Sequence, residues 1–349
     1  MTTLAFAGAG RITVVHGLAA RAVGGLTVTH IASRTAATAS ERAGQVGAAV
    51  CRYDELPAGA DVVLVATPPA RHATDALQSM AAGAKVIVEK PMATTLADAD
   101  DLVAASAAAG HALGYAENLA FAPVIVAAEA LTAEIGALRH LEVRALQGRP
   151  DWGGFLEADW GGGALFDLGV HPLAVALLLA RAADGPPGGS RVVSVRADLT
   201  GADDIEVDEQ ARAWITFASG LVAVVEASWA SEQPSWDLQA ASDTGVVRAE
   251  LIPHLLLERN GEPIALPSLA EGTELPQLRQ FGYVAQLEDL LADFAAGREP
   301  VMGAEFGRDV LEIVCAAYAS AALGGEAVPM PFTGPRDRTP LQLWRSPAV

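Results

Sequence analysis

Short apolar runs alternate with alanine-rich segments along the first 120 residues. The clearest runs are Leu4–Ala7, Val28–Ile31, Val62–Val65 and Lys85–Val88, and each is expected to be a strand. Stretches of helix-forming composition, such as residues 70–82, lie between them. Continuously apolar strands separated by helices are typical of a parallel sheet covered on both faces. This pattern predicts a doubly wound α/β domain of the Rossmann type over residues 1–120.

After about residue 120 the pattern changes to strands that follow one another. We expect a strand at 139–145, a glycine-rich loop at 153–163 and a helix over 172–182. From Val192 on, further strands are expected at 211–217, 221–229, 246–251 and 254–258. Ala218-Ser219-Gly220 and Asn260-Gly261 are typical hairpin turns, so these strands predict a mostly antiparallel, open sheet.

Two amphipathic helices are expected towards the end of the chain. One apolar face consists of Phe281, Val284, Leu287, Leu291 and Phe294, and the other of Phe306, Val310, Ile313 and Ala317. The tail from Pro329 is proline-rich and is expected to pack irregularly. Residues 121–349 are therefore predicted to form an α+β domain for substrate binding and oligomerisation.

The composition excludes some classes of protein and disfavours some classes of ligand. The 349 residues are 51% hydrophobic and 19% charged, which excludes a disordered or fibrous protein. The net charge of −19 disfavours binding to nucleic acid or to a membrane surface.

The cysteines and the apolar stretches bear on location. Cys51 and Cys315 form neither a disulfide framework nor a metal spacing, which fits a reducing compartment and predicts no metal site. The start of the chain has no targeting pattern, and the apolar stretch 164–183 is interrupted by Asp167, His171 and Pro172. We therefore expect a soluble, cytoplasmic protein.

A glycine turn follows the first predicted strand. Gly8-Ala9-Gly10-Arg11-Ile12-Thr13 has two of the three glycines of a dinucleotide-binding fingerprint, with Thr13 in place of the third. The two glycines let the backbone approach a pyrophosphate at a helix N-terminus. We expect the first helix to lie slightly further from the strand because of Thr13.

The residues after the second strand indicate which dinucleotide is bound. NAD binding usually uses a carboxylate there, but no Asp or Glu precedes Glu41. Ser33-Arg34-Thr35 offers a guanidinium between two hydroxyls, which suits a 2′-phosphate. NADP is therefore favoured over NAD, the alternative being that Arg34 is a solvated loop residue.

Candidate catalytic groups follow later strands. Thr67-Pro68 with His72 follows the Val62–Val65 strand, and Glu89-Lys90-Pro91 ends the Lys85–Val88 strand, where α/β sheets bind ligands. Lys90 is one of only two lysines, so it suggests chemistry rather than surface charge. An exposed structural lysine is the alternative.

A second motif lies in the other half of the chain. Asp167 and His171, within Gly162–Pro172, are four residues apart and would share one side of a helical turn. An acid beside an imidazole can orient it and raise its basicity. Asp/His pairs at this spacing also occur as ordinary structural contacts.

Together these motifs resemble the glucose–fructose oxidoreductase / inositol dehydrogenase / MocA (Gfo/Idh/MocA) family over nearly the whole chain. The resemblance implies that Lys90, Asp167 and His171 are catalytic and line the substrate pocket under the nicotinamide. Family members often have another Asp three residues after the histidine. Here that position is Ala174, which casts doubt on the usual polyol contacts.

The candidate ligand-binding residues follow from these motifs. The expected cofactor-binding residues are Gly8, Ala9, Gly10, Arg11, Ile12, Ser33, Arg34, Thr35, Thr67, Pro68, His72, Glu89, Lys90 and Asn118. The expected substrate-binding residues are Lys90, Asn118, Arg149, Trp152, Trp160, Asp167 and His171. Core packing is the alternative for the two tryptophans, and solvent exposure for Arg149.

The resemblance implies reversible hydride transfer between nicotinamide C4 and a secondary alcohol of a sugar, cyclitol or related small molecule. His171 would be the general base, because histidine titrates near neutral pH, and Lys90 would stabilise the alkoxide. Asp167 would orient His171 or bind a hydroxyl. A non-catalytic dinucleotide sensor and a redox-assisted epimerase or lyase with retained cofactor are the rival functions.

A homodimer or homotetramer through the C-terminal sheet is also expected. Apolar side chains between Trp214 and Val225 would form the contact if helices cover only one face of the sheet. The alternative is that they are buried within the subunit.

Overall fold

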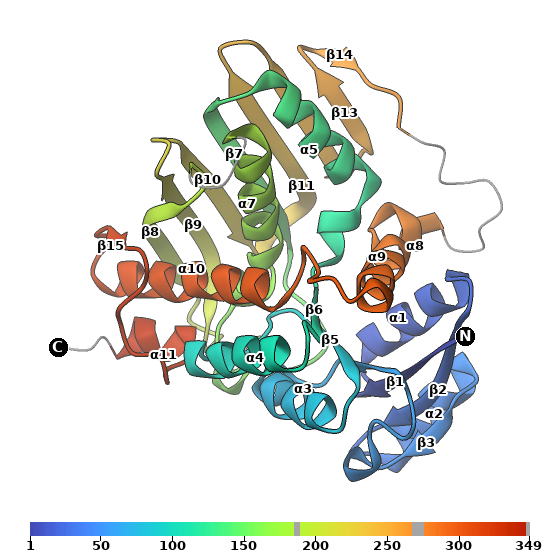
Figure 1. Cartoon of the computed structure of the whole chain (residues 1–349). Coiled ribbons are helices and arrows are strands. Elements are labelled where there is room, and N and C mark those ends of the chain that lie inside the picture. Colours follow the sequence, from blue (N-terminus) through green and yellow to red (C-terminus); the bar gives the residue numbers. More distant parts are fainter. Residues whose placement is uncertain (185–188, 267–275, 347–349) are drawn as a thin grey trace. The chain divides into compact units, whose positions relative to one another are not determined.

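The computed structural model describes residues 1–184, 189–266 and 276–346 (Figure 1). By residue contacts the chain divides into two units, Met1–Asn118 with Leu275–Asp309 and Leu119–Glu274 with Val310–Val349. These units are discontinuous in sequence, whereas the predicted domains, 1–120 and 121–349, are contiguous.

The first unit contains a six-stranded parallel sheet with the order β3-β2-β1-β4-β5-β6. Its strands are β1 (Thr2–Ala7), β2 (Leu26–Ala32), β3 (Ala49–Cys51), β4 (Val62–Val65), β5 (Lys85–Glu89) and β6 (Leu113–Ala116). Its helices before residue 118 are α1 (Arg11–Ala22), α2 (Ala36–Val46), α3 (His72–Ala81) and α4 (Leu96–Ala108), with 3-10 turns at Tyr53–Glu55 and Pro69–Arg71. The doubly wound Rossmann prediction is confirmed.

The apolar runs form strands because both of their faces are buried. All four residues of β4 are buried, and so are Leu4–Ala7 of β1. The edge strand β3 has only three residues, two of them exposed, so it gave no comparable apolar signal.

Late segments of the chain complete the first unit. Helices α8 (Pro276–Gln280) and α9 (Tyr283–Ala296) belong to it, and α9 packs against α1. The Tyr115 N–H donates to the Met302 carbonyl at 2.7 Å, which adds this segment beside β6. In α9, Val284, Leu287, Leu290 and Phe294 are buried, so the predicted apolar face is nearly correct.

The second unit contains a nine-stranded sheet with the order β14-β13-β12-β11-β7-β10-β9-β8-β15. Its strands are β7 (Leu138–Gly148), β8 (Val192–Gly201), β9 (Asp208–Phe217), β10 (Val222–Ser228), β11 (Ala230–Ser242), β12 (Val246–Ile252), β13 (Leu256–Arg259), β14 (Glu262–Pro263) and β15 (Val328–Pro329). Among the described residues, β10 and β7 pair in parallel and the other strand pairs of this sheet are antiparallel, which confirms the mostly antiparallel prediction.

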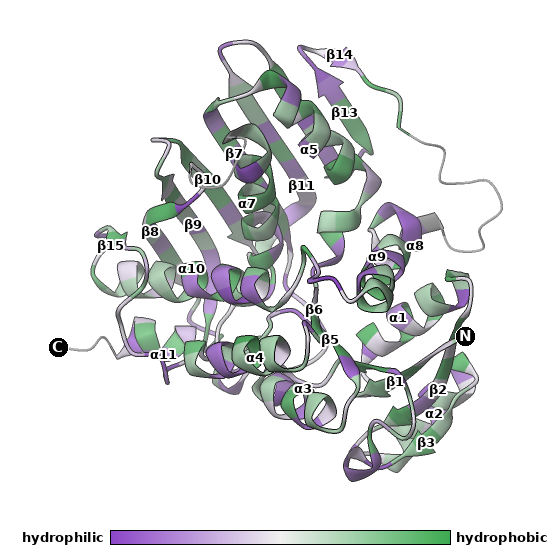
Figure 2. Cartoon of the chain, in the orientation of Figure 1, coloured by the Kyte–Doolittle hydropathy of each residue, from purple (hydrophilic) through white to green (hydrophobic). Residues whose placement is uncertain are grey.

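Strand β11, at Ala230–Ser242, is not among the strands predicted from the sequence. Strand β11 has 13 residues and pairs with β7 and β12. Pro234 and the polar residues around it interrupt the apolar pattern that would indicate a strand in the sequence. In the structure, a register shift between Ala230 and Ser235 accommodates them. Bands of hydrophobic and hydrophilic positions along this sheet are visible in Figure 2.

Helices cover one face of the second sheet (Figure 1). Helix α5 (Pro123–Ile135) packs on β12, and α7 (Val170–Asp184) packs on β7 and β10. The short helix α6 (Ala164–Asp167) packs on β9, and Ser320 of α10 (Ala304–Ala322) accepts a hydrogen bond from the Ala197 N–H of β8. The core therefore lies between these helices and the inward-facing strand residues.

The tail is more regular than the sequence analysis predicted. Val328–Pro329 pairs with β8 as β15, and α11 (Pro340–Arg345) follows. Thr339 caps this helix, and Leu341 and Leu343 are buried. The prolines mark element ends here rather than an irregular segment, because proline fits a helix start and a sheet edge.

Neither a membrane span in a single helix nor a cluster of metal ligands occurs among the described residues. No single helix in the described ranges is long and apolar enough to span a bilayer, although the bent pair Ala158–Asp167 and Val170–Ala183 passes the length and composition criteria together. Within the same ranges, no group of three or more His, Cys, Asp or Glu side chains could hold a metal ion.

Candidate active site

The glycine turn between β1 and α1 leaves room for a pyrophosphate. Gly8 has a φ of +119°, and a Cβ there would lie 2.4 Å from the Ala66 carbonyl oxygen of the neighbouring strand end. Gly10 is the N-cap of α1, and a Cβ there would meet nothing within 4 Å. No side chain caps α1 and its first turn has no acidic residue, so its N–H groups fit a dinucleotide phosphate. Ala9, Arg11 and Ile12 complete this turn.

Thr13 has a structural task at the third fingerprint position. Its side chain is fully buried, and its hydroxyl donates to the Gly8 carbonyl at 3.1 Å. The side chain that replaces the fingerprint glycine therefore stabilises the turn.

The residues after β2 lie at the protein surface. Arg34 and Thr35 are exposed, and the Thr35 N–H donates to the Ser33 hydroxyl at 3.3 Å. Tyr53 lies close enough for its pKa to respond to Arg34: burial and Asp75 raise this pKa, whereas Arg71 and Arg34 lower it, and the net shift is upward.

Arg71 adds a second cation beside Tyr53. Its guanidinium lies 5.3 Å from the Tyr53 ring centroid and also forms an ion pair with Asp75. Tyr53 is therefore in contact with Arg71 and feels the charge of Arg34 as well.

His72 joins the ends of β4 and β5. It is buried, with Nε2 2.7 Å from the Thr67 carbonyl oxygen and Nδ1 2.8 Å from that of Pro91. Burial lowers the pKa of His72, which favours the neutral imidazole. A neutral imidazole can donate a hydrogen bond to only one of these two carbonyl oxygens. The Thr67 hydroxyl donates to Asp75 at 2.9 Å. The predicted cofactor residues Thr67, Pro68 and His72 thus form a braced turn.

Glu89 holds the backbone of Lys90. One of its carboxylate oxygens accepts the Lys90 N–H at 3.0 Å, and the other lies 2.6 Å from His16 Nε2. Burial raises the Glu89 pKa, but the hydrogen bond from His16 and electrostatic interactions with His16, Lys90 and His72 outweigh it, so the pKa lies below its ordinary value. His16 was not singled out in the sequence.

The two lysines have different surroundings. The Lys85 ammonium donates to the Gly110 carbonyl at 3.1 Å and lies 6.0 Å from the Phe294 ring centroid. Lys90 is partly buried, at the residue that follows β5. The two lysines therefore differ in position: Lys85 is bonded to a loop carbonyl, and Lys90 follows the carboxyl end of a parallel strand.

Asn118 stands where β6 leads out of the first unit. Its side chain is buried, and its amide nitrogen donates to the Phe281 carbonyl at 2.7 Å. This contact fixes the orientation of the amide.

Asp167 and His171 lie on either side of a break between two helices. Asp167 is the last residue of α6 and His171 is in the first turn of α7, so the predicted single helical turn is interrupted at Leu168–Gly169. Both side chains are buried, and the His171 and Trp236 rings lie 5.6 Å apart at 33°. The predicted helix over 172–182 begins two residues earlier than expected.

Asp208 and Tyr318, which the sequence did not single out, fix the start of α6. The buried carboxylate of Asp208 accepts N–H bonds from Gly163 at 2.8 Å and Leu165 at 2.9 Å, and also accepts the Tyr318 hydroxyl. A Cβ on Gly163 would lie 2.0 Å from the Asp208 carbonyl oxygen. Burial outweighs these hydrogen bonds and raises the Asp208 pKa.

The loop before α6 contains the other predicted substrate contacts. Trp152 is 45% exposed and meets Phe155 edge to face, whereas Trp160 is partly buried against Phe155 and the core around it. The Arg149 guanidinium forms ion pairs with Asp204 and Glu209. Of the two indoles, that of Trp152 is the more accessible.

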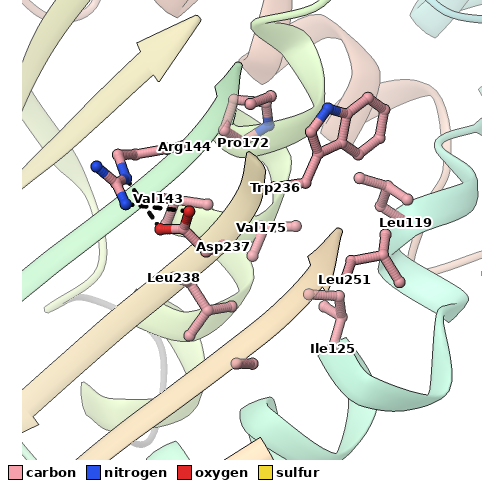
Figure 3. Close-up of a pocket in the computed structure, with 12 residues that line it drawn as sticks. Leu119, Ile125, Val143, Arg144, Pro172, Val175, Trp236, Asp237, Leu238 and Leu251 are labelled. Carbon is pink, nitrogen blue, oxygen red and sulfur yellow. Dashed lines mark hydrogen bonds and ion pairs between the residues drawn. The ribbon is translucent and has the colours of Figure 1, made fainter. Parts of the chain in front are cut away.

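A pocket in the second unit has Trp236 and Pro172 in its wall. It encloses about 320 Å³, including its opening, and its lining residues are Leu119, Ile125, Val143, Arg144, Ala145, Pro172, Val175, Trp236, Asp237, Leu238, Ala249 and Leu251. Figure 3 shows Trp236, Leu119 and Leu251 gathered at one end, while Arg144 and Asp237 pair with each other. The pocket wall is therefore mostly apolar.

Comparison with protein families decides the relationship. Residues 2–116 match the model of an oxidoreductase family with an NAD-binding Rossmann fold, and residues 127–248 match the Gfo/Idh/MocA C-terminal domain. The chain belongs to the Gfo/Idh/MocA family of oxidoreductases. The predicted family, fold class and enzyme class are thus confirmed.

Individual relatives of this Gfo/Idh/MocA protein are sugar-modifying enzymes by name. A protein of Amycolatopsis mediterranei named as a UDP-kanosamine synthase oxidoreductase subunit is 31% identical over 304 residues, which cover 77% of this chain and 81% of that protein. The UDP-N-acetylglucosamine 3-dehydrogenase of Acidithiobacillus ferrooxidans is 28% identical and covers 78% of this chain and 84% of its own.

A solved structure of the same fold contains a dinucleotide. GenD2 from gentamicin A biosynthesis, in complex with NAD, is 27% identical and superposes with a TM-score of 0.82 over 94% of this chain and 96% of its own. The fold of this Gfo/Idh/MocA member is thus one that binds NAD in a related protein.

Proposed function

We propose that this protein catalyses reversible hydride transfer between a nicotinamide dinucleotide and a secondary alcohol of a sugar, cyclitol or related small molecule. The observation that carries the proposal is the strand end of β5, where Glu89 fixes the backbone of Lys90. The names of relatives support a sugar hydroxyl, and two of them are 3-dehydrogenases, acting on UDP-N-acetylglucosamine and on D-glucosides.

The roles of the catalytic residues follow from their chemistry. His171 removes the hydroxyl proton during oxidation and returns it during reduction. The Lys90 ammonium donates a hydrogen bond to the same oxygen and stabilises its developing charge. Asp167 orients His171 or binds a neighbouring hydroxyl. When bound, the nicotinamide accepts or supplies the hydride.

Site variants test these roles. Purified protein is incubated with NAD or NADP and with UDP-N-acetylglucosamine, methyl D-glucoside or myo-inositol, and nicotinamide absorbance is followed. Because general base catalysis supplies about 10²–10⁴-fold, we expect His171→Ala to lower kcat by that factor without unfolding, and Lys90→Met to be similarly impaired. Near-normal turnover in both variants would overturn the assignment.

The rival functions give different results in the same assay. A retained cofactor with product isomers but no net NADH or NADPH would indicate an epimerase or lyase. Cofactor binding without turnover of any tested alcohol, unaltered by Lys90→Met, would indicate a sensor.

We further propose that NADP is preferred over NAD. Exposed Arg34 between two hydroxyl residues, with Arg71 nearby beside Tyr53, supplies cations and donors suited to a 2′-phosphate. No carboxylate stands in the Ser33–Thr35 segment to bind a ribose 2′-hydroxyl.

Replacing the guanidinium tests the cofactor preference. We expect Arg34→Ala to weaken NADPH binding about tenfold, corresponding to loss of one charge-assisted hydrogen bond, and to spare NADH. Dissociation constants from nicotinamide fluorescence measure both cofactors, with the surface variant Arg52→Ala as the control. Equal losses for NADPH and NADH would remove the argument.

A further inference from the structure

A buried histidine contacts the carboxylate that holds Lys90. His16 is fully buried in α1, six residues after the Gly10 N-cap, and its Nε2 lies 2.6 Å from Glu89 Oε1. Glu89 itself is at the end of β5. The contact therefore joins the helix that begins at the cofactor turn to the strand that ends at Lys90.

The surroundings of His16 leave Glu89 as its polar partner. The Tyr283 ring stands edge-on to the imidazole, with centroids 5.5 Å apart at 86°. Within the described residues, His16 Nδ1 has no hydrogen-bond partner. The His16 imidazole is therefore held between the Tyr283 ring and the Glu89 carboxylate.

Glu89 in turn has both oxygens engaged. Oε1 faces His16, and Oε2 accepts the Lys90 N–H at 3.0 Å. Without His16 one oxygen of a buried carboxylate would lack this partner, which costs free energy unless the group turns or takes up a proton. Rotation of the group would break its bond to the Lys90 N–H, and protonation would weaken that bond because a neutral carboxyl is a poorer acceptor than a carboxylate.

We propose that His16 is a positioning residue that fixes Lys90 through Glu89. The proposal rests on the proposed function, in which Lys90 contacts the reacting oxygen. A displacement of about 1 Å in such a group can lower a rate by about 10²-fold, so a hydrogen bond in the core of the first unit can control turnover.

Several titratable groups share this core and must be considered in any pH profile. Glu89 interacts with His16, Lys90 and His72, and the buried Tyr115 and Tyr283 both interact with Glu89 and Glu117. Each of these groups stays the same in variants at position 16, so a change in profile reports the loss of the imidazole.

The lysine content provides a direct readout. Lys85 and Lys90 are the only lysines, so reductive methylation with ¹³C-formaldehyde gives two side-chain NMR signals besides that of the amino terminus. We expect His16→Leu to move the Lys90 signal and its titration midpoint while leaving those of Lys85 unchanged. His16→Gln, whose amide can still donate to Glu89, should restore most of the wild-type Lys90 signal.

Kinetics on the substrate found in the alcohol panel complete the test. We expect His16→Leu to lower kcat about 10–100-fold, with cofactor dissociation constants and KM within about threefold of wild type. His30→Leu, in β2, is the control and should keep wild-type kinetics. A wild-type Lys90 signal and kcat in His16→Leu would overturn the proposal.

Two further variants keep the proposal decidable. Should His16→Leu fail to fold, Glu89→Gln must still shift the Lys90 signal and lower kcat, and wild-type values there would also overturn the proposal. Near-normal turnover by Lys90→Met would refute the catalytic role of Lys90 on which the proposal rests, whereas a wild-type protein that turns over none of the tested alcohols would refute the proposed function. An inactive Lys90→Met beside a wild-type-like His16→Leu would refute only the role of His16.

Discussion

The three fingerprint positions of the cofactor turn have separate tasks. Gly8 lets the β1 end approach the β4 end, Gly10 leaves open space at the start of α1, and Thr13 ties its hydroxyl to the Gly8 carbonyl. The fold thus requires the first glycine, and we propose that the second is required by the bound dinucleotide.

Alanine at the two glycines should separate folding from cofactor binding. We expect Gly8→Ala to lower the free energy of unfolding by about 1–3 kcal/mol or more, because φ is +119° and the Cβ would clash with Ala66. Gly10→Ala should fold normally but bind the dinucleotide more weakly. Urea unfolding and fluorescence titration measure the two effects, and equal stability losses would contradict this division.

Glu89 should make stability depend on pH. Its folded pKa lies below the ordinary value of 4.5, so its contribution is present above pH 4.5 and is lost as the pH falls through the folded pKa. We therefore expect wild type to exceed Glu89→Gln in thermal stability by a constant amount from pH 7 to about pH 5, and the gap to close in stronger acid. A gap independent of pH down to pH 3 would contradict the ionised state of Glu89.

Some residues of the candidate site could be predicted from the sequence, and others could not. Lys90 stands out because lysine is rare here and Glu-Lys-Pro ends an apolar strand. His16 and Asp208 lie in ordinary helical and strand surroundings, and their partners are 73 and 45 residues away. Long-range hydrogen bonds leave no local pattern, so these positioning contacts emerge only in the folded chain.

At the scale of elements, helix α6 depends on a carboxylate from β9. It has four residues, too few to be stable alone, and Asp208 accepts hydrogen bonds at its start. Asp167 is the last residue of this short helix, and His171 lies in the first turn of the next. The position of α6, which ends at Asp167, thus depends on β9, a strand that comes later in the sequence.

Removing this carboxylate should disturb both stability and the motif. We expect Asp208→Ala to lower the free energy of unfolding by about 1.5–3 kcal/mol, because buried N–H groups lose a charged acceptor. The exposed Asp198→Ala on β8 is the matched control and should change stability by less than about 0.5 kcal/mol. Chemical denaturation measures both, and equal effects would argue against a special role for Asp208.

The elements predicted best are those whose periodicity is set by burial. The buried parallel strands and the helices α9 and α10 follow their apolar patterns closely. Strand β11 was not predicted because its first six residues are mostly polar. Its pairing depends on the neighbouring strands β7 and β12. Tertiary pairing overrides local preference in such a strand.

At the scale of the whole molecule, one face of the large sheet lacks a helical layer in the described residues. Trp214 of β9 stands on that face between two arginines, with Arg196 and Arg212 at 4.9 and 5.4 Å from its ring centroid. Its neighbours Ile215 and Phe217 are buried within the subunit. We propose that the outward side chains of this face join protomers into a homo-oligomer.

Analytical ultracentrifugation tests this association. We expect Trp214→Asp to shift the protein towards monomer while its circular dichroism stays unchanged, because Trp214 lies outside the helix-covered core. Trp152→Ala, an exposed tryptophan outside the sheet, is the matched control and should keep the wild-type mass. A monomeric wild type would dispose of the proposed assembly.

The discontinuous first unit has a consequence for engineering. A fragment that stops at residue 118 would lack α9, the Tyr283 ring beside His16 and the Met302 carbonyl beside β6. Transplanting the nucleotide module into a sister enzyme therefore demands two inserts, the amino-terminal stretch and the segment 275–309, and a chimera built with a single junction would leave α1 without its cover.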